Sequence, residues 1–337
     1  MSITIKKIAE DLQLAVSTVS KALRDSHEIS LETKKRVFEY AEKLNYLPNP
    51  YASSLKRKSS GNIAVVLPEV ADSFFSTAIN GIESIAQDKG YHVIVYLTHE
   101  DQHREQSILK SFRSGRVDGV LMSVAGGTES NDHIRELCSA GMPLVFFDRV
   151  SEDIPAAKVL TNDFESGYQA AEHLIKRGCK RIAFLSMAGD LAITNQRLLG
   201  FEKAHLDHQL KIKRNQIIYC TQQESRTFDL IKKLLQRKDR PDGIVGSVEK
   251  VTMQVYSVCH ALKLKIPRDV KVIGFSNLPI AALLNPPLTT ITQPAFEMGK
   301  AAATILFKAL DGKRIDLQKE LIIIPSALYE RESTRKR

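Results

Sequence analysis

From Gly61 to the carboxyl end, the chain alternates between short apolar runs and longer segments with helical periodicity. The runs are rich in β-branched and aromatic residues, as buried parallel strands are. In chain order they read NIAVVLP, YHVIVYL, VDGVLMS, PLVFFD, AAKVLTN, KRIAFLS, QIIYC, DGIVGS, VKVIGFS, LTTITQP and ELIIIPS. The helical segments span residues 75–89, 101–114, 131–140, 166–178, 193–208, 224–237, 249–263 and 295–311. This alternation predicts parallel sheets with helices on both faces.

The alternation begins a second time at AAKVLTN, so we expect two doubly wound α/β lobes. LTTITQP, the last long helix and ELIIIPS form one further strand-helix-strand cycle. Such sheets bind small molecules at the carboxyl ends of their strands, and two lobes create a cleft between them. The interlobe cleft is therefore the expected ligand site.

Phosphate-cradle and nucleophile motifs that would support an enzyme are missing from the sequence. No G-x-G-x-x-G follows the first strand, and neither G-x-x-x-x-G-K-[ST] nor G-x-S-x-G is present. The four cysteines, Cys138, Cys179, Cys220 and Cys259, form no C-x-x-C pair. We therefore expect a binding protein with no cofactor, metal or catalytic residue, and keep a cleft enzyme as an alternative.

The amino-terminal segment, residues 4–45, contains three short helical patterns. The first, TIKKIAEDL, begins at the capping residue Thr4, and the third begins at the capping residue Ser30. The second, VSTVSKALRD, follows a break at residues 13–15 and has Val19 and Leu23 spaced to pack on the first. Two short helices, a tight turn and a bracing third helix predict an all-α helix-turn-helix DNA-binding head. Three-helix units also serve as protein-binding modules, which is the alternative.

The outer face of the second helix carries Val16, Ser17, Ser20 and Lys21, with little acidic charge. Hydroxyl groups can contact base edges and phosphates, a lysine can reach guanine or phosphate, and a valine can touch a thymine methyl. This face suits a helix that enters the major groove. An ordinary solvent-exposed helix with serines would look similar.

The charge distribution agrees with a polyanionic partner. The chain has a formal charge of +9, and residues 1–60 contain 11 Lys and Arg against 7 Asp and Glu. The start, MSITIKKIAEDLQ, is too charged for a secretory signal, and no apolar run is long enough to cross a membrane. We expect a cytoplasmic protein with no membrane partner.

Motifs over roughly the first 55 residues resemble the amino-terminal region of the lac-repressor family of bacterial transcription regulators. They occur in order: T-I-x-x-I-A, V-S-x-V-S-K-A-L, E-T-x-x-R-V and N-Y-x-P-N-P-x-A-x-x-L. The resemblance implies that Val16, Ser17 and Lys21 read base edges and that Thr4, Thr18 and Ser20 hold the DNA backbone. Where family members have a glycine in the turn and a serine cap, this chain has Gln13 and Ala15. We expect each departure to weaken the unit by roughly 1 kcal/mol.

The basic stretch NPYASSLKRKSSG contains one leucine that cannot bury itself in a core of its own. The resemblance implies a hinge helix that folds on DNA and enters the minor groove. Tyr51, Leu55 and Lys56 would then contact DNA, with Leu55 as a wedge that opens a base step. A flexible linker whose leucine contacts the nearby lobe is the alternative.

The resemblance continues to about residue 325 and implies an effector-binding core similar to periplasmic sugar-binding proteins. Phe74, Asp148, Arg149 and Arg197 fall where family members touch their ligands, although Asp148 and Arg149 would also suit a surface ion pair. On the other lobe, Ser247, followed by Val248, and Ser276 stand where sugar-responsive members carry larger polar anchors. A sugar therefore cannot be assumed, and the small-molecule effector is a sugar or another metabolite.

The expected protein is a repressor that binds a pseudo-palindromic double-stranded DNA operator as a homodimer. The half-sites should lie about one helical turn apart. The alternative is a cytosolic small-molecule-binding protein with a protein-interaction head. The expected domains are a head (1–48), a hinge helix or linker (49–60), a first lobe (61–160 with 289–320), a second lobe (161–288 with 321–330) and a tail (331–337).

Overall fold

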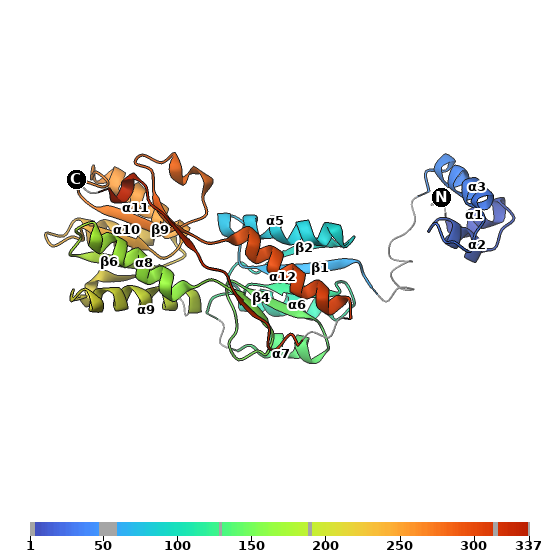
Figure 1. Cartoon of the computed structure of the whole chain (residues 1–337), viewed down its shortest axis with the longest axis horizontal. Helices are drawn as coiled ribbons and strands as arrows, with labels where there is room; N and C mark the ends of the chain where they lie inside the picture. The colour runs from blue at the N-terminus through green and yellow to red at the C-terminus, as the bar shows by residue number, and fades with distance from the viewer. Residues whose placement is uncertain (1–3, 47–58, 128–129, 188–190, 313–315, 336–337) are drawn as a thin grey trace. The chain divides into compact units, whose positions relative to one another are not determined.

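The computed structural model describes residues 4–46, 59–127, 130–187, 191–312 and 316–335. The chain divides into two compact units, Met1–Ser60 and Gly61–Arg337 (Figure 1). We call the first unit the head and the second the core. Within the described ranges, no helix is long and apolar enough to span a bilayer.

The head is a bundle of three helices, α1 (Ile5–Asp11), α2 (Val16–Ala22) and α3 (Leu31–Lys43). Thr4 and Ser30 cap α1 and α3 through their hydroxyl oxygens, which accept from backbone amides three residues on. The three helices bury a small apolar core: Ile8, Ala9, Val19, Ala22, Val37 and Ala41. The predicted helix-turn-helix head and both predicted caps are confirmed.

The first lobe of the core is a fully parallel six-stranded sheet with the order β11-β5-β4-β3-β1-β2. Its strands are β1 (Asn62–Leu67), β2 (His92–Leu97), β3 (Gly119–Met122), β4 (Leu144–Phe147), β5 (Ala157–Leu160) and β11 (Leu321–Ile323). Helices α5 (Ser73–Asp88) and α12 (Ala295–Leu310) cover one face. Helices α6 (Gln102–Phe112) and α7 (Asp132–Ser139) cover the other. Because both faces are covered, the inner strands β1, β3 and β4 are almost wholly apolar and buried, as predicted.

The second lobe repeats this arrangement with the strand order β12-β10-β9-β8-β6-β7. Its strands are β6 (Ile182–Met187), β7 (Ile217–Cys220), β8 (Gly243–Gly246), β9 (Lys271–Phe275), β10 (Thr289–Thr292) and β12 (Ala327–Tyr329). Helices α8 (Asp163–Lys176) and α9 (Ala192–Asp207) cover one face, and α10 (Glu224–Leu235) and α11 (Glu249–Ala261) cover the other. Short 3-10 helices lie at Arg214–Gln216, Pro279–Ala282 and Glu332–Thr334.

The lobe boundaries differ from the sequence-based expectation in the last third of the chain. Strand β10 pairs with β9 in the second sheet, although 289–320 was expected in the first lobe. Strand β11 pairs with β5 in the first sheet, although 321–330 was expected in the second. The last predicted strand-helix-strand cycle therefore connects two sheets instead of adding to one. The unpredicted strand β12 returns to the second sheet and pairs antiparallel with β10.

Three chain segments consequently connect the lobes, at residues 161–162, 293–294 and 324–326. Figure 1 shows the last of them as the long red segment that runs from one lobe to the other. Residues beside these connections lie between the two sheets, where a change in the angle between the lobes would be felt first.

Each lobe contains one helix pair that packs backbone to backbone through glycines (Figure 1). In the first lobe, a Cβ atom on Gly81 of α5 would lie 2.1 Å from the carbonyl oxygen of Phe296 in α12. In the second, a Cβ on Gly200 of α9 would lie 1.9 Å from the carbonyl oxygen of Phe164 in α8. Such approaches exclude any side chain larger than hydrogen, so these glycines fix the distance between the helices.

Candidate functional site

Helix α2 presents the predicted DNA-reading face to solvent. Val16 and Ser17 are exposed in its first turn, while Val19 and Ala22 on the opposite side are fully buried in the core of the head. Thr18, Ser20 and Lys21 are partly exposed. Val16, at the start of this short helix, is 43% exposed and so gives up almost half of the benefit of burial.

The turn before α2 has the two expected weaknesses. Gln13 has φ of 55°, in the left-handed region that glycine adopts most easily. Ala15 is the N-cap of α2 and offers no side-chain oxygen to the free amides of the first turn. Gln13 therefore occupies a position where glycine would cost less.

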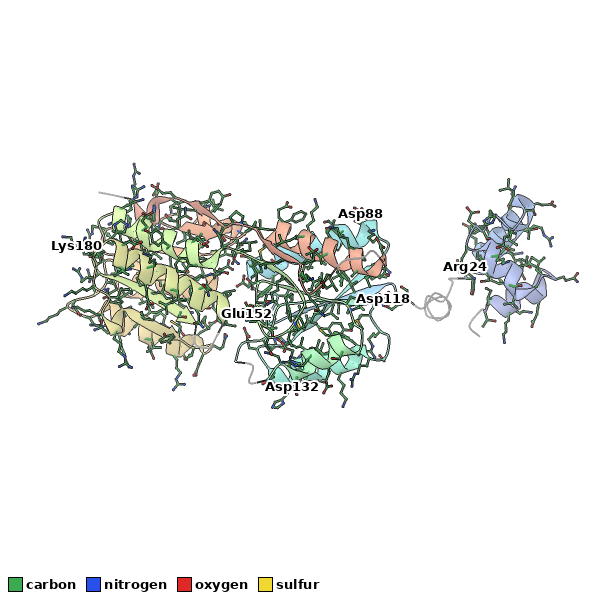
Figure 2. The ribbon with its side chains drawn as sticks, turned by 60° about the horizontal axis from the view of Figure 1, so that its bottom comes forward. Arg24, Asp88, Asp118, Asp132, Glu152 and Lys180 are labelled. Atoms are coloured by element: carbon green, nitrogen blue, oxygen red, sulfur yellow. The ribbon has the colours of Figure 1, made fainter. Side chains whose placement is uncertain are left out.

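Two polar residues of the DNA-reading face are engaged within the head. Lys21 forms an ion pair with Glu28, and the hydroxyl of Ser20 accepts a hydrogen bond from the guanidinium group of Arg24. Arg24, two residues after the end of α2, is labelled in Figure 2. The Lys21 ammonium group holds the pKa of Glu28 below its usual range. Glu28 therefore competes with DNA for the Lys21 ammonium group.

We therefore expect Glu28→Gln to tighten DNA binding by a few-fold, because an exposed ion pair is weak but competes directly with phosphate for the lysine. Fluorescence anisotropy at fixed salt concentration measures the change. Glu32→Gln, in the first turn of α3, is the control with the same change in net charge. An equal gain from both variants would mean that only net charge matters and that the Lys21–Glu28 pair does not.

Residues 47–58 lie outside the described part of the chain. They include Tyr51, Leu55 and Lys56, so the expected hinge helix and its DNA contacts stay predictions.

The core contains a pocket between its lobes at the carboxyl ends of strands from both sheets. Five of the six predicted effector residues line it: Phe74, Asp148, Arg149, Arg197 and Ser276. The sixth, Ser247, is fully buried and does not line the pocket, but its backbone carbonyl oxygen accepts a hydrogen bond from Arg197. The free volume is about 30 Å³, room for about two water molecules.

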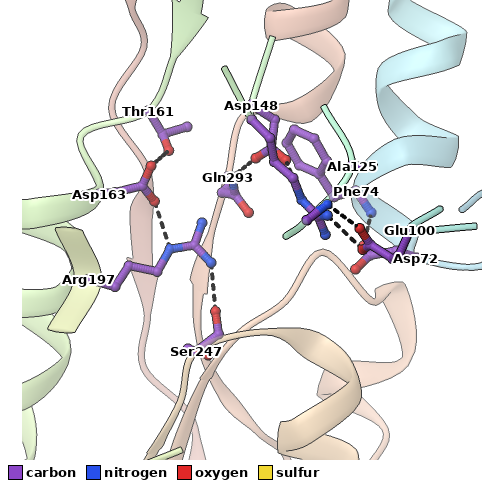
Figure 3. Close-up of polar contacts among 12 residues, drawn as sticks. Asp72, Phe74, Glu100, Ala125, Asp148, Thr161, Asp163, Arg197, Ser247 and Gln293 are labelled. Carbon is purple, nitrogen blue, oxygen red and sulfur yellow. Dashed lines mark hydrogen bonds and ion pairs between the residues drawn. The ribbon is translucent and has the colours of Figure 1, made fainter. Parts of the chain in front are cut away.

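Arg197 lines the pocket, and at 1% exposure it is the largest of the fully buried side chains in the described part of the chain. Its Nε donates to Asp163 Oδ1 over 2.7 Å, and its Nη1 donates to the Ser247 carbonyl oxygen over 2.6 Å (Figure 3). The guanidinium carbon lies 4.0 Å from the centre of the Phe275 ring, a cation–π distance. Within the described part of the chain, Nη2 has no hydrogen-bond partner. This nitrogen is free to donate to a ligand.

Asp148 and Arg149 are largely buried, with Arg149 Nε 3.9 Å from Asp148 Oδ2, so they are not a surface ion pair. Asp148 is buried, has φ of 61° and accepts a hydrogen bond from Gln293 Nε2 at 3.2 Å. Arg149 Nη1 donates to Glu100 Oε1 at 2.7 Å. Burial raises the pKa of Asp148 from 3.8 to about 6, against the opposing effect of the two arginines.

This shift predicts a pH dependence of stability. Because the folded-state pKa of Asp148 is raised, the folded protein binds its proton more tightly, and stability falls as pH rises from about 4 through 6. Asp148→Asn should remove this slope and raise the free energy of unfolding at pH 7 by about 2–3 kcal/mol. Asparagine tolerates positive φ and keeps an acceptor for Gln293.

Urea denaturation across this pH range measures the effect. Asp153→Asn is the matched control and should change stability in the opposite direction, since hydrogen bonds from Ser151 and Asn131 lower the pKa of Asp153. It should lose stability at pH 7. A stability of Asp148→Asn equal to that of the parent at pH 7 would contradict the assigned burial cost.

Val248 and Asn277, which directly follow the predicted residues Ser247 and Ser276, also line the pocket. The other lining residues were not identified from the sequence: Asp72, Phe75, Ile193, Glu249, Phe275 and Gln293. Several lie at or shortly after the carboxyl ends of β8, β9 and β10, so their position after a predicted strand could have identified them as lining residues. Glu249 contacts Ser73 of α5 across the cleft. That contact depends on the angle between the lobes, so no local sequence pattern predicts it.

Residues 99–103 read H-E-D-Q-H, so the expectation that the sequence has no H-E-x-x-H pattern of zinc metalloproteases is wrong. The pattern requires both histidines on one helix face. Here His99 and Glu100 have positive φ and precede α6, which begins at Gln102. Glu100 is paired with Arg149. The described residues contain no group of three His, Cys, Asp or Glu that could hold a metal ion.

The chain matches two family models, one on each side of the break between head and core. Residues 4–49 match the model of bacterial regulatory proteins of the lacI family, and residues 171–334 match a periplasmic binding protein-like domain. The relatives include a probable HTH-type transcriptional regulator, EndR, of Paenibacillus polymyxa, 31% identical over 100% of this chain and 99% of the relative. The HTH-type transcriptional repressor PurR of Aliivibrio fischeri is 30% identical over 92% of each chain.

Among solved structures, the lac repressor dimer bound to operator and the anti-inducer ONPF superposes with a TM-score of 0.86. The match covers 99% of both chains at 21% identity. At this identity the likeness concerns the fold, and it agrees with a three-helix head followed by two α/β lobes.

Proposed function

Because this chain belongs to the lacI family of bacterial regulatory proteins, we propose that it is a transcriptional repressor whose DNA affinity is set by a small molecule in the interlobe cleft. It binds a pseudo-palindromic operator in double-stranded DNA as a homodimer and acts in the cytoplasm, where that DNA is. The observation that carries this proposal is the outward face of α2, whose exposed Val16 and Ser17 have no role in the core of the head.

In the complex, α2 lies in the major groove. Val16 contacts a thymine methyl, Ser17 a base edge and Lys21 a guanine or phosphate, while Thr4, Thr18 and Ser20 contact the DNA backbone. The hinge places Leu55 in the minor groove, flanked by Tyr51 and Lys56. Base contacts give specificity, and the basic head gives salt-dependent affinity.

The effector binds between the lobes, where Arg197 Nη2 is free to donate. A pocket of about 30 Å³ is far below the roughly 300 Å³ or more that a metabolite site requires. Binding beside Arg197 therefore requires the lobes to separate or rotate. The effector shifts this equilibrium by the difference between its affinities for the two arrangements, and the hinge transmits the change to the heads.

We infer regulation and not catalysis, because the polar groups of the cleft are engaged with one another. Arg197 with Asp163 and Arg149 with Glu100 form closed ion pairs. Neither pair places a nucleophile beside a base. The ligand in this cleft is therefore an effector and not a substrate.

Selection of bound genomic fragments from the organism's own DNA tests the proposal. The full chain should enrich fragments that share one pseudo-palindrome with half-sites about one helical turn apart. The double variant Val16→Ala/Ser17→Ala, which leaves the buried face of α2 intact, should lose this enrichment while its head stays folded. Enrichment of the same motif by both proteins would exclude α2 as the reading element.

A further inference from the structure

Glu249 is held by hydrogen-bond donors from both lobes of the core. It lies in the first turn of α11 in the second lobe, and it is buried. Its Oε1 accepts from the backbone amide of Ser73 at 3.3 Å, and the Ser73 hydroxyl donates to Oε2. Ser73 is the first residue of α5 and belongs to the first lobe.

The remaining donors to this carboxylate come from the lobe of Glu249 itself. Ser276 Oγ donates to Oε2 at 2.9 Å, and the backbone amide of Asn277 donates to the same oxygen at 3.3 Å. Both residues directly follow β9. Four donors from two lobes therefore surround one carboxylate, and two of them are backbone amides that cannot turn away.

This donor set suits an anion for two reasons. Hydrogen bonds to a carboxylate are stronger than those to a neutral acceptor, and the amino end of a long helix such as α5 favours negative charge. The neighbouring carboxyl of Asp72, which caps α5, opposes this preference, and its pKa is raised to about 6 by burial and then by Glu249. Glu249 stays in contact with Ser73 in spite of that repulsion.

We infer that Glu249 acts as a built-in ligand: its carboxylate connects Ser73 of the first lobe to Ser276 of the second and holds the cleft closed without an effector. An effector that opens or rearranges the cleft must displace this contact. The same donors would accept the carboxylate of a small organic acid in place of Glu249. The effect on DNA affinity rests on the proposed function, whereas the closure of the core does not.

The closure is measured on the full chain by energy transfer between one dye on each lobe. Glu83 of α5 and Lys203 of α9 are exposed and suit cysteine labelling in a Cys138→Ser background. Labelled subunits are diluted into unlabelled protein so that energy transfer occurs only between two dyes on the same chain. The parent should give one high-transfer population with no metabolite added.

Glu249→Ala should reduce the ratio of closed to open cores by about tenfold or more, because bonds from both lobes to a charged group are lost. Sodium formate should restore the high-transfer population by occupying the vacated donors, and sodium chloride at equal ionic strength should not. Glu100→Ala is the matched control, since Glu100 is a glutamate that pairs with Arg149 inside the first lobe. It should stay closed.

Glu249→Gln serves if the alanine variant does not fold, as judged by thermal melting. Its amide group must turn an N–H toward one of the donors, so it should open the core in the same direction. Closed cores in a folded Glu249 variant, or opening that formate does not reverse, would overturn the inference. Operator binding by the parent is measured separately, so a failure of the proposed function leaves the closure result unaffected.

Discussion

Arg197→Ala should lower the free energy of unfolding by on the order of 3–5 kcal/mol, one of the largest effects expected in this chain. Asp163 would remain buried with its charge unpaired, and the Ser247 carbonyl oxygen would lose its donor. The contact of the guanidinium group with the Phe275 ring would also be lost. Chemical denaturation at pH 7 measures the change.

The double variant Asp163→Ala/Arg197→Ala tests the cause, since it removes the stranded charge and should recover part of the loss. Arg177→Ala provides the surface comparison, because Arg177 pairs with the half-exposed Glu330. Its loss should be within about 1 kcal/mol. If Arg197→Ala costs no more than Arg177→Ala, the buried ion pair does not contribute as we describe.

Gly200→Ala should destabilise the second lobe by about 3 kcal/mol, because the new methyl group would overlap the backbone of α8. It would lie 1.9 Å from the Phe164 carbonyl oxygen and 2.7 Å from the Tyr168 amide nitrogen, and backbone cannot turn aside. The separation of α8 from α9 would also move Arg197 away from Asp163, so ligand response should weaken with stability.

The sign of the stability change in Gly200→Ala is decisive. If there were space for the methyl group, replacing glycine by alanine would stabilise the helix by about 1 kcal/mol. Gln196→Ala, on the exposed face of the same helix, is the control for propensity and should change stability little. A higher melting temperature for Gly200→Ala would contradict the close approach of the two helices.

The parts of this fold that could be predicted from the sequence are those that leave a local pattern. Strands covered on both faces are continuous apolar runs, as in NIAVVL of β1, and hydroxyl caps such as Thr4 and Ser30 precede their helices directly. The exchange of β10 and β11 between sheets left no such pattern. It depends on α12 packing against α5 through Gly81 and Gly299, which are far apart in the chain.

The cleft shows the same division. Asp148 and Ser276 follow strands, so their place at the sheet edge could be predicted from strand ends alone. Two other contacts could not be predicted: the ion pair between Arg197 and Asp163, and the hydrogen bond from Ser73 to Glu249. Both contacts are set by how helices and lobes pack, and neither residue has a distinctive neighbourhood in the sequence.

An anisotropy titration of the full chain against its selected operator and a scrambled duplex, at physiological salt, tests the central claim most directly. We predict a Kd of about 10⁻⁸ M or lower for the operator, at least about 10³-fold tighter than for the scrambled duplex. Equal affinities for the two duplexes in the micromolar range of non-specific binding would contradict sequence-specific regulation by this chain.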